Sequence, residues 1–112
     1  MGAKANIVID QGTDFSTTLT VTDDSGTAVD LTGYTANGHI RKHYTSTTAT
    51  PFTVAFTSPR TTGKLTISLS RTVTANIESG RYVYDVEITS AANTRSRLVE
   101  GIATVTPEVT RA

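Results

Sequence analysis

The sequence predicts an all-β fold, and the main observation behind this prediction is an alternation of apolar and polar side chains. The alternation is plainest where Phe15, Leu19 and Val21 fall on one side of an extended chain and serine or threonine on the other. A period of two is typical of a strand with one buried face. Threonine is also abundant, which favours strands over helices. Turn residues recur about every 8–12 residues, a spacing typical of all-β sandwiches.

Three strands are expected in the first half of the chain, over 7–9, 15–21 and 36–44. The polar run 23–27 contains a glycine suited to positive φ and predicts a hairpin turn. Asp30 is placed to cap a further tight turn before the third strand.

In the second half, the Thr- and Ser-rich run 45–51 predicts a mobile loop, and strands are expected over 52–56 and 64–70. The period then breaks over 72–78, where an apolar pair four residues apart predicts a short helical turn. Gly80 is expected to end that turn as a C′ residue.

The last two strands are expected over 82–88 and 98–105, joined by a hairpin loop at 91–94. The alternation of apolar and polar residues is interrupted near Glu100-Gly101, which predicts a β-bulge there. Pro107 is expected to end the strand. Together the elements predict an all-β, immunoglobulin-like antiparallel β-sandwich of about seven strands with one short helical turn. A small closed barrel is the alternative architecture.

The length of 112 residues predicts a single domain over 1–112, with flexible tails at 1–5 and 108–112. The formal net charge is zero, which gives the chain no general attraction to nucleic acid or to a membrane surface. Cysteine is absent, so no disulfide stabilises the fold. No apolar run approaches the length of a membrane helix, so we expect no membrane partner.

No catalytic, cofactor or metal site is expected. His39 and His43 lie four residues apart on a predicted strand, about 13 Å along it, which is too far for one metal ion. The aspartates of the first third suit turns better than a calcium loop. A nucleophile elbow, a cysteine nucleophile and a glycine-rich phosphate loop are all absent from the sequence, so the prediction is that the chain is not an enzyme.

Several segments resemble a known family. Asp30-Leu31-Thr32-Gly33-Tyr34 leads into a strand that carries Arg41-Lys42, and 63–69, the helical turn and Gly80–Ile88 follow in order. This succession, which continues through 98–101 and 105–110, resembles small β-sandwich domains of tailed-phage structural proteins. It is similar in particular to the immunoglobulin-like N-terminal domains of upper baseplate proteins and to short structural proteins of T4-like marine phages.

The resemblance implies a virion structural protein, made in the host cytoplasm and placed in the tail or baseplate. Its partners would be other virion proteins and further copies of itself, bound through exposed strand edges. The first strand, 7–10, and the last, 98–105, are the expected contact elements, and the loop 44–51 is expected to become ordered on binding. The expected contact residues are Ile7, Ile9, Arg41, Lys42, Tyr44, Arg97 and Val99.

Two alternatives stay open at this point. One is a capsid decoration protein with the same fold. The other is a carbohydrate-binding or adhesion module for host-surface glycans, which would need exposed aromatic side chains in a shallow groove. The sequence has no tryptophan, which disfavours the glycan-binding alternative.

Overall fold

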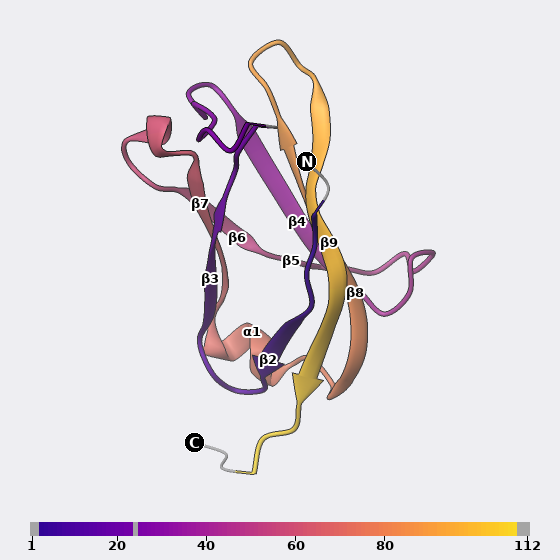
Figure 1. Cartoon of the computed structure of the whole chain (residues 1–112). Helices are drawn as coiled ribbons and strands as arrows, with labels where there is room; N and C mark the ends of the chain where they lie inside the picture. Colours follow the sequence, from indigo (N-terminus) through magenta and orange to yellow (C-terminus); the bar gives the residue numbers. More distant parts are fainter. Residues whose placement is uncertain (1–2, 24, 110–112) are drawn as a thin grey trace.

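The computed structural model describes residues 3–23 and 25–109, and it confirms the all-β prediction. The strands form a six-stranded sheet in the order β1-β9-β8-β4-β5, with β2 also pairing β9, and a three-stranded sheet in the order β3-β7-β6 (Figure 1). A 3-10 helix, η1 (Arg60–Thr62), and a short helix, α1 (Arg71–Ala75), lie on either side of β7 in the chain. The strands are β1 (Ala3–Lys4), β2 (Ile7–Asp10), β3 (Phe15–Thr20), β4 (Thr35–Arg41), β5 (Thr50–Pro51), β6 (Thr53–Phe56), β7 (Lys64–Leu69), β8 (Gly80–Thr89) and β9 (Arg95–Thr106).

One hydrophobic core lies between the two sheets. The six-stranded sheet contributes Val86 and Ile88, and the three-stranded sheet contributes Leu65 and Ile67, all fully or almost fully buried. These residues alternate with solvent-facing polar ones along their strands, as the period of two predicts. The core therefore forms from the same alternation that sets the strands.

The chain from β5 to β6 passes from one sheet to the other. β5 pairs with β4, whereas β6 pairs with β7, and between them the Phe52 amide donates to the Gly38 carbonyl over 2.9 Å. The Phe52 ring packs edge-on against Tyr84, with 6.1 Å between centroids. This crossing links the sheets along one side, while β3 and the β1–β2 segment form edges on the other.

The last strand is not a sheet edge, which corrects our expectation for 98–105. β9 lies between β8 and the N-terminal strands, because β1 and β2 both pair with it in parallel. Residues 3 and 4, expected in a flexible tail, form β1, while residues 1–2 and 110–112 of the expected tails lie outside the described residues. At the other end, the Glu108 amide donates to the Gln11 side-chain oxygen over 3.0 Å.

The bulge predicted at Glu100-Gly101 is also wrong in position. The register with β8 shifts between Val86, opposite Val99, and Glu87, opposite Arg97, so the extra residue of β9 is Leu98. Leu98 and Val99 are consecutively buried, as two residues opposite one partner allow. The glycine at 101 instead gives room to Ala5, whose carbonyl oxygen would overlap a side-chain carbon at that position.

The helical turn predicted over 72–78 is α1, Arg71–Ala75, one residue earlier at its start and three residues earlier at its end. The Ser70 hydroxyl caps its first turn by accepting the Val73 amide over 3.3 Å. Buried Thr74 donates its hydroxyl to the Thr13 carbonyl over 2.8 Å, which ties the helix to the β2–β3 loop. Gly80 begins β8 rather than ending the helix, since Asn76 is the C-cap.

Aspartates hold the turns between β3 and β4. The Asp23 carboxylate accepts the amides of Ser25 and Thr27 at 2.9 and 3.0 Å. The Thr27 amide and then the Ser25 hydroxyl lower the pKa of Asp23 below its usual 3.8. The pKa of Asp30 is lowered in the same way, first by the Thr32 hydroxyl at 2.6 Å and then by the Thr32 amide. The predicted role of these aspartates in turns is confirmed.

Acid should weaken these turns. A carboxyl group with a depressed folded-state pKa stabilises the fold above its unfolded value, 3.8, and loses this contribution as the pH falls through the folded-state value. Asparagine keeps an accepting oxygen but does not titrate, so the Asp23→Asn/Asp30→Asn variant should lose less stability on acidification. Urea midpoints measured from about pH 6 to about pH 2 test this. Parallel curves for variant and wild type would contradict it.

Candidate functional site

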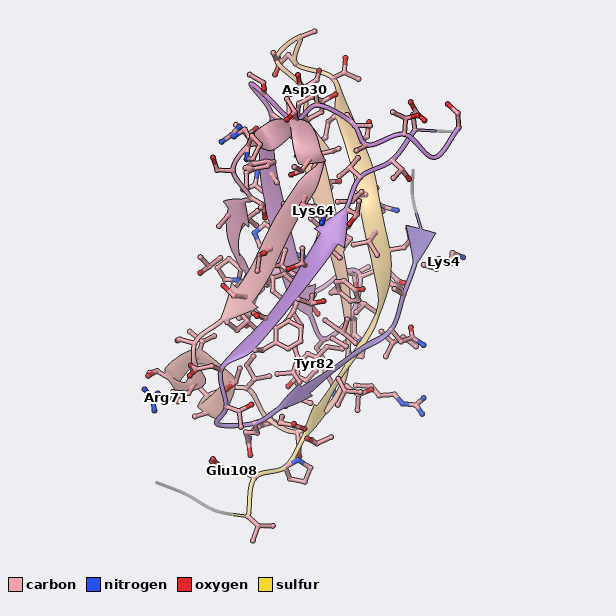
Figure 2. The ribbon with its side chains drawn as sticks, turned by 60° about the vertical axis from the view of Figure 1, so that its left-hand side comes forward. Lys4, Asp30, Lys64, Arg71, Tyr82 and Glu108 are labelled. Atoms are coloured by element: carbon pink, nitrogen blue, oxygen red, sulfur yellow. The ribbon has the colours of Figure 1, made fainter. Side chains whose placement is uncertain are left out.

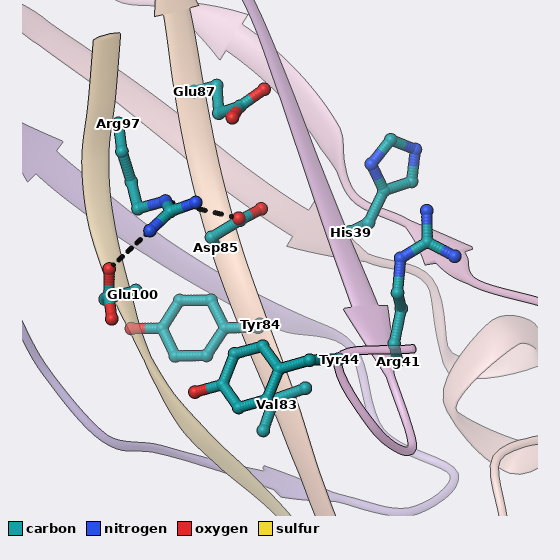
Figure 3. Close-up of a pocket in the computed structure, with 9 residues that line it drawn as sticks. All are labelled: His39, Arg41, Tyr44, Val83, Tyr84, Asp85, Glu87, Arg97 and Glu100. Atoms are coloured by element: carbon teal, nitrogen blue, oxygen red, sulfur yellow. Dashed lines mark hydrogen bonds and ion pairs between the residues drawn. The ribbon is translucent and has the colours of Figure 1, made fainter. Parts of the chain in front are cut away.

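An open hollow of about 340 Å³ lies on the outer face of the six-stranded sheet (Figure 3). Strands β4, β8 and β9 form it, because Ile40 and Tyr84 turn toward the core and their neighbours along β4 and β8 therefore turn outward. Tyr84 also lines the hollow, although its side chain is almost fully buried. The lining residues are His39, Arg41, Tyr44, Val83, Tyr84, Asp85, Glu87, Arg97 and Glu100.

Arg97 is held between two carboxylates at one side of this hollow. Its Nη1 donates to Glu100 Oε2 over 2.9 Å, and its Nε lies 3.4 Å from Asp85 Oδ2 (Figure 3). The hydrogen bond and charge of Glu100, and then the charge of Asp85, raise the pKa of the Arg97 guanidinium. The guanidinium is thus a fixed positive charge with half of its side chain still exposed.

Apolar side chains lie next to this charged cluster on the same face. Val83 is directly opposite Ile102 in the β8–β9 register, and Val83 also lines the hollow together with Tyr44. Tyr44 is 77% exposed and Ile102 39%. We call Tyr44, Val83 and Ile102 the apolar strip. Exposed apolar side chains are ordinary when single, but a group beside ordered charges is typical of a contact surface.

The loop after β4 is fastened to the strand that precedes it. Arg41 Nη1 donates to the carbonyl oxygens of Ser46 and Thr48 at 2.9 and 3.4 Å. The Ser46 hydroxyl accepts the His43 amide over 3.0 Å, and the Ser46 amide donates to the His43 carbonyl. These bonds form a turn that presents Tyr44 to solvent.

Three of the seven expected contact residues, Arg41, Tyr44 and Arg97, line this hollow. Lys42 is also exposed, but its ammonium lies 4.8 Å from the centre of the Tyr82 ring, a cation–π contact outside the hollow.

The other three expected contact residues face inward. Ile7 is half-buried and packs against the core. Ile9 and Val99 are only 0% and 4% exposed, so their side chains contribute to the core and not to the outer surface. Both lie at inward positions of paired strands, which removes them from solvent.

Sequence reasoning did not select Asp85, Glu100 or Ile102 as contact residues. The alternation over 82–88 placed Asp85 on the outer face, but only the strand order shows that β8 lies between β4 and β9. Two tyrosine hydroxyls reach backbone carbonyls: Tyr84 donates to the Ala5 carbonyl over 2.6 Å, and Tyr82 donates to the Glu78 carbonyl over 2.7 Å. Burial raises the pKa of both phenols, and the charge of Glu78 adds to the effect at Tyr82.

Within residues 3–23 and 25–109, no group of three or more His, Cys, Asp or Glu side chains is arranged to hold a metal ion. Among the helices in that part of the chain, none has the length and apolar character needed to cross a membrane. Comparison with models of known protein families finds no match, and comparison with curated proteins finds none either.

Proposed function

We propose that this chain is a structural protein that works by protein–protein assembly, as a component of a tailed-phage tail or baseplate. The outer face of its six-stranded sheet is the docking surface in this proposal. The observation that carries it is the apolar strip lying beside the ordered Arg97 cluster. The sequence resemblance supports two further parts of the proposal. These are the location in a virion and an immunoglobulin-like arrangement of the two sheets.

The composition of this face suits a protein partner. Tyrosine and arginine are over-represented among the residues that dominate binding energy, and interfaces combine an apolar centre with a polar rim. Arg97 is already held by Glu100 and Asp85, so docking would immobilise little additional side-chain freedom. Water screens ion pairs as exposed as these, so they contribute little to the stability of the fold. Their ordering therefore fits a contact role better than a folding role.

A surface variant tests the docking face. The Tyr44→Ser/Ile102→Thr variant removes the two most exposed members of the apolar strip while leaving the core intact. We expect its incorporation into purified particles, measured by immunoblot, to fall at least about tenfold relative to wild type, with an unchanged melting temperature. Val73→Ser is the matched control, because Val73 is 37% exposed but lies on α1. Equal incorporation of all three proteins would contradict the docking face.

Immunogold electron microscopy of the same particles tests the location. Label at the tail tip is the expected result. Label over the head would replace the tail assignment by capsid decoration. Intact particles without label would overturn the virion role and would favour the glycan-binding alternative, in which Tyr44 would be the aromatic contact.

A further inference from the structure

Strand β3 forms an open edge of the three-stranded sheet. In the part of the chain that the structure describes, β3 pairs with β7 alone. The Val21 amide donates to the Gly63 carbonyl over 2.7 Å and continues the β3–β7 register. Since hydrogen-bonded positions alternate along an antiparallel pair, the odd-numbered residues of β3 bond to β7. The N–H and C=O groups of Ser16, Thr18 and Thr20 therefore point away from the sheet.

The pairing of β7 with β6 independently supports the conclusion that the even-numbered backbone groups of β3 point outward. The Thr57 amide donates to the Lys64 carbonyl over 3.0 Å, so the even-numbered residues of β7 bond to β6. The odd-numbered ones are then left for β3. No hydrogen bond within residues 3–23 and 25–109 reaches the outward backbone groups of β3 from another loop or side chain. Figure 2 brings this edge forward, with Lys64 beside the end of β3.

This edge lacks the features that keep other edges of the fold from pairing. Residues 15–20 contain no charged side chain and no proline. By contrast, β5 has only two residues and ends in Pro51, β1 carries Lys4, and β2 ends in Asp10. β6 has only four residues and runs on from β5. β3 is thus the longest unprotected edge of these strands.

The inner face of β3 is also incompletely covered. Phe15 and Leu19 are half-buried, whereas the residues opposite them on β7, Leu69 and Leu65, are 3% and 0% exposed. Their strand is the last of its sheet, so one side of each apolar side chain stays open to water. A further strand at this edge would cover them.

We propose that β3 pairs with β3 of a second copy, antiparallel about a twofold axis, with Thr18 opposite the second copy's Thr18. This inference rests on the proposed assembly role and names the first partner in it. In this register Ser16 lies opposite Thr20 of the other copy, and the three outward residues of each copy exchange about six backbone hydrogen bonds. The two three-stranded sheets become one continuous sheet.

The side chains in this register are compatible with a second copy. On the outer face, serine and threonine hydroxyls meet only serine and threonine, a favourable cross-strand combination. On the inner face, Leu19 lies beside the second copy's Thr17, which covers part of the exposed apolar surface. No like charges meet, because the segment is uncharged. A charged or proline-containing strand would lack this match.

A cysteine at the twofold axis reports the register directly, since the chain has no cysteine of its own. Hydrogen-bonded antiparallel residues have Cα atoms about 5.5 Å apart, a separation that a disulfide spans. The Thr18→Cys protein should form a disulfide-linked species of twice 11.9 kDa on mild oxidation, seen on non-reducing gels. Thr66→Cys is the matched control: it loses the same 3.1 Å contact between the Thr18 and Thr66 hydroxyls, but its strand lies inside the sheet. Equal crosslinking of both proteins would overturn the register.

Sedimentation velocity over a concentration series tests the pairing without oxidation. We expect wild type to form dimers and Thr18→Lys to weaken the dimer at least about tenfold, because two lysines then face each other on the axis. Thr66→Lys should dimerise as wild type does, and circular dichroism confirms that each variant is folded. A folded wild-type chain that stays monomeric at millimolar concentration overturns the proposal.

The same proteins separate this inference from the proposed function. Monomeric wild type that still enters particles overturns the β3 pairing alone. Dimeric wild type that fails to enter particles overturns the assembly role and leaves the pairing intact. A third outcome is a monomeric wild type whose incorporation into particles is lost in the Thr18→Lys variant but kept in the Thr66→Lys variant. This outcome would overturn self-pairing and would indicate that β3 pairs with a strand of another protein.

Discussion

Replacing Gly101 by alanine is expected to detach the N-terminal segment from the six-stranded sheet. A side-chain carbon at this position would overlap the carbonyl oxygen of Ala5 and would lie 3.2 Å from the side-chain oxygen of Asn6. β9 is held on its other side by the long pairing with β8, so it has little freedom to retreat. The segment with few contacts of its own, residues 3–6, is the part that must move.

Three hydrogen bonds depend on that close approach. The Ala5 amide donates to Glu100 over 2.9 Å, Tyr84 donates to Ala5 over 2.6 Å, and the Ile102 amide donates to Asn6 over 3.1 Å. Each is worth about 1 kcal/mol, and the Tyr84 hydroxyl is left without its partner. We therefore expect the free energy of unfolding to fall by about 2–4 kcal/mol. Hydrogen exchange at the amides of Ala5 and Ile102 should accelerate in the variant.

Urea unfolding in two backgrounds makes this test specific. In a chain that begins at Ile7, the segment that meets position 101 is absent, so Gly101→Ala should change the unfolding free energy by less than about 0.5 kcal/mol. The difference between the two backgrounds isolates the contact. A large loss in both backgrounds would show that the effect comes from β9 itself and not from Ala5.

Gly101 also illustrates how far the sequence predicts this fold. A glycine inside a strand indicates either a bulge or a close backbone approach, and local sequence does not distinguish them. The close approach occurs at 101, and the bulge occurs three residues earlier at Leu98. The partner that decides the matter, Ala5, is 96 positions away in the sequence.

The strands with clear alternation are the ones that the sequence predicts well. Over 15–21, 64–70 and 82–88 the inward positions are those of the observed core, because one-sided burial is what produces a period of two. β1 was missed, since two residues cannot show a period. Its strand character comes from pairing with β9, which is a tertiary contact.

The outward orientation of some residues of the candidate site was predictable from the sequence, but their grouping was not. Alternation places Asp85 and Arg41 on outer faces, yet the strand order β9-β8-β4 brings them to one hollow. Ile9 and Val99 were expected at the surface because their strands were expected to be edges. Parallel pairing of the two ends of the chain buries Val99, and inward orientation buries Ile9.

Replacing Ile67 by alanine is expected to lower the free energy of unfolding by about 2–5 kcal/mol, the usual range for a large-to-small change in a core. Ile67 is 0% exposed and lies in the middle of β7, opposite Thr17 of β3 and Val54 of β6. The loss is a large share of the roughly 5–15 kcal/mol that stabilises a domain. Urea unfolding at low protein concentration measures it without a contribution from self-association.

Replacing Ile67 by alanine leaves a cavity in the core, and two further variants separate the cost of that cavity from the other effects of the substitution. Ile67→Val keeps the β-branched shape and should lose only about 0.5–1.5 kcal/mol. Thr66→Ala changes the adjacent residue on the outer face, where only the hydroxyl contact with Thr18 is lost, so it should cost about 1 kcal/mol or less. If Ile67→Ala costs no more than Thr66→Ala, the core between the sheets does not stabilise the fold as burial implies. If the order holds, β7 is the strand through which β3 and β6 are jointly held against the larger sheet, since both pair with it.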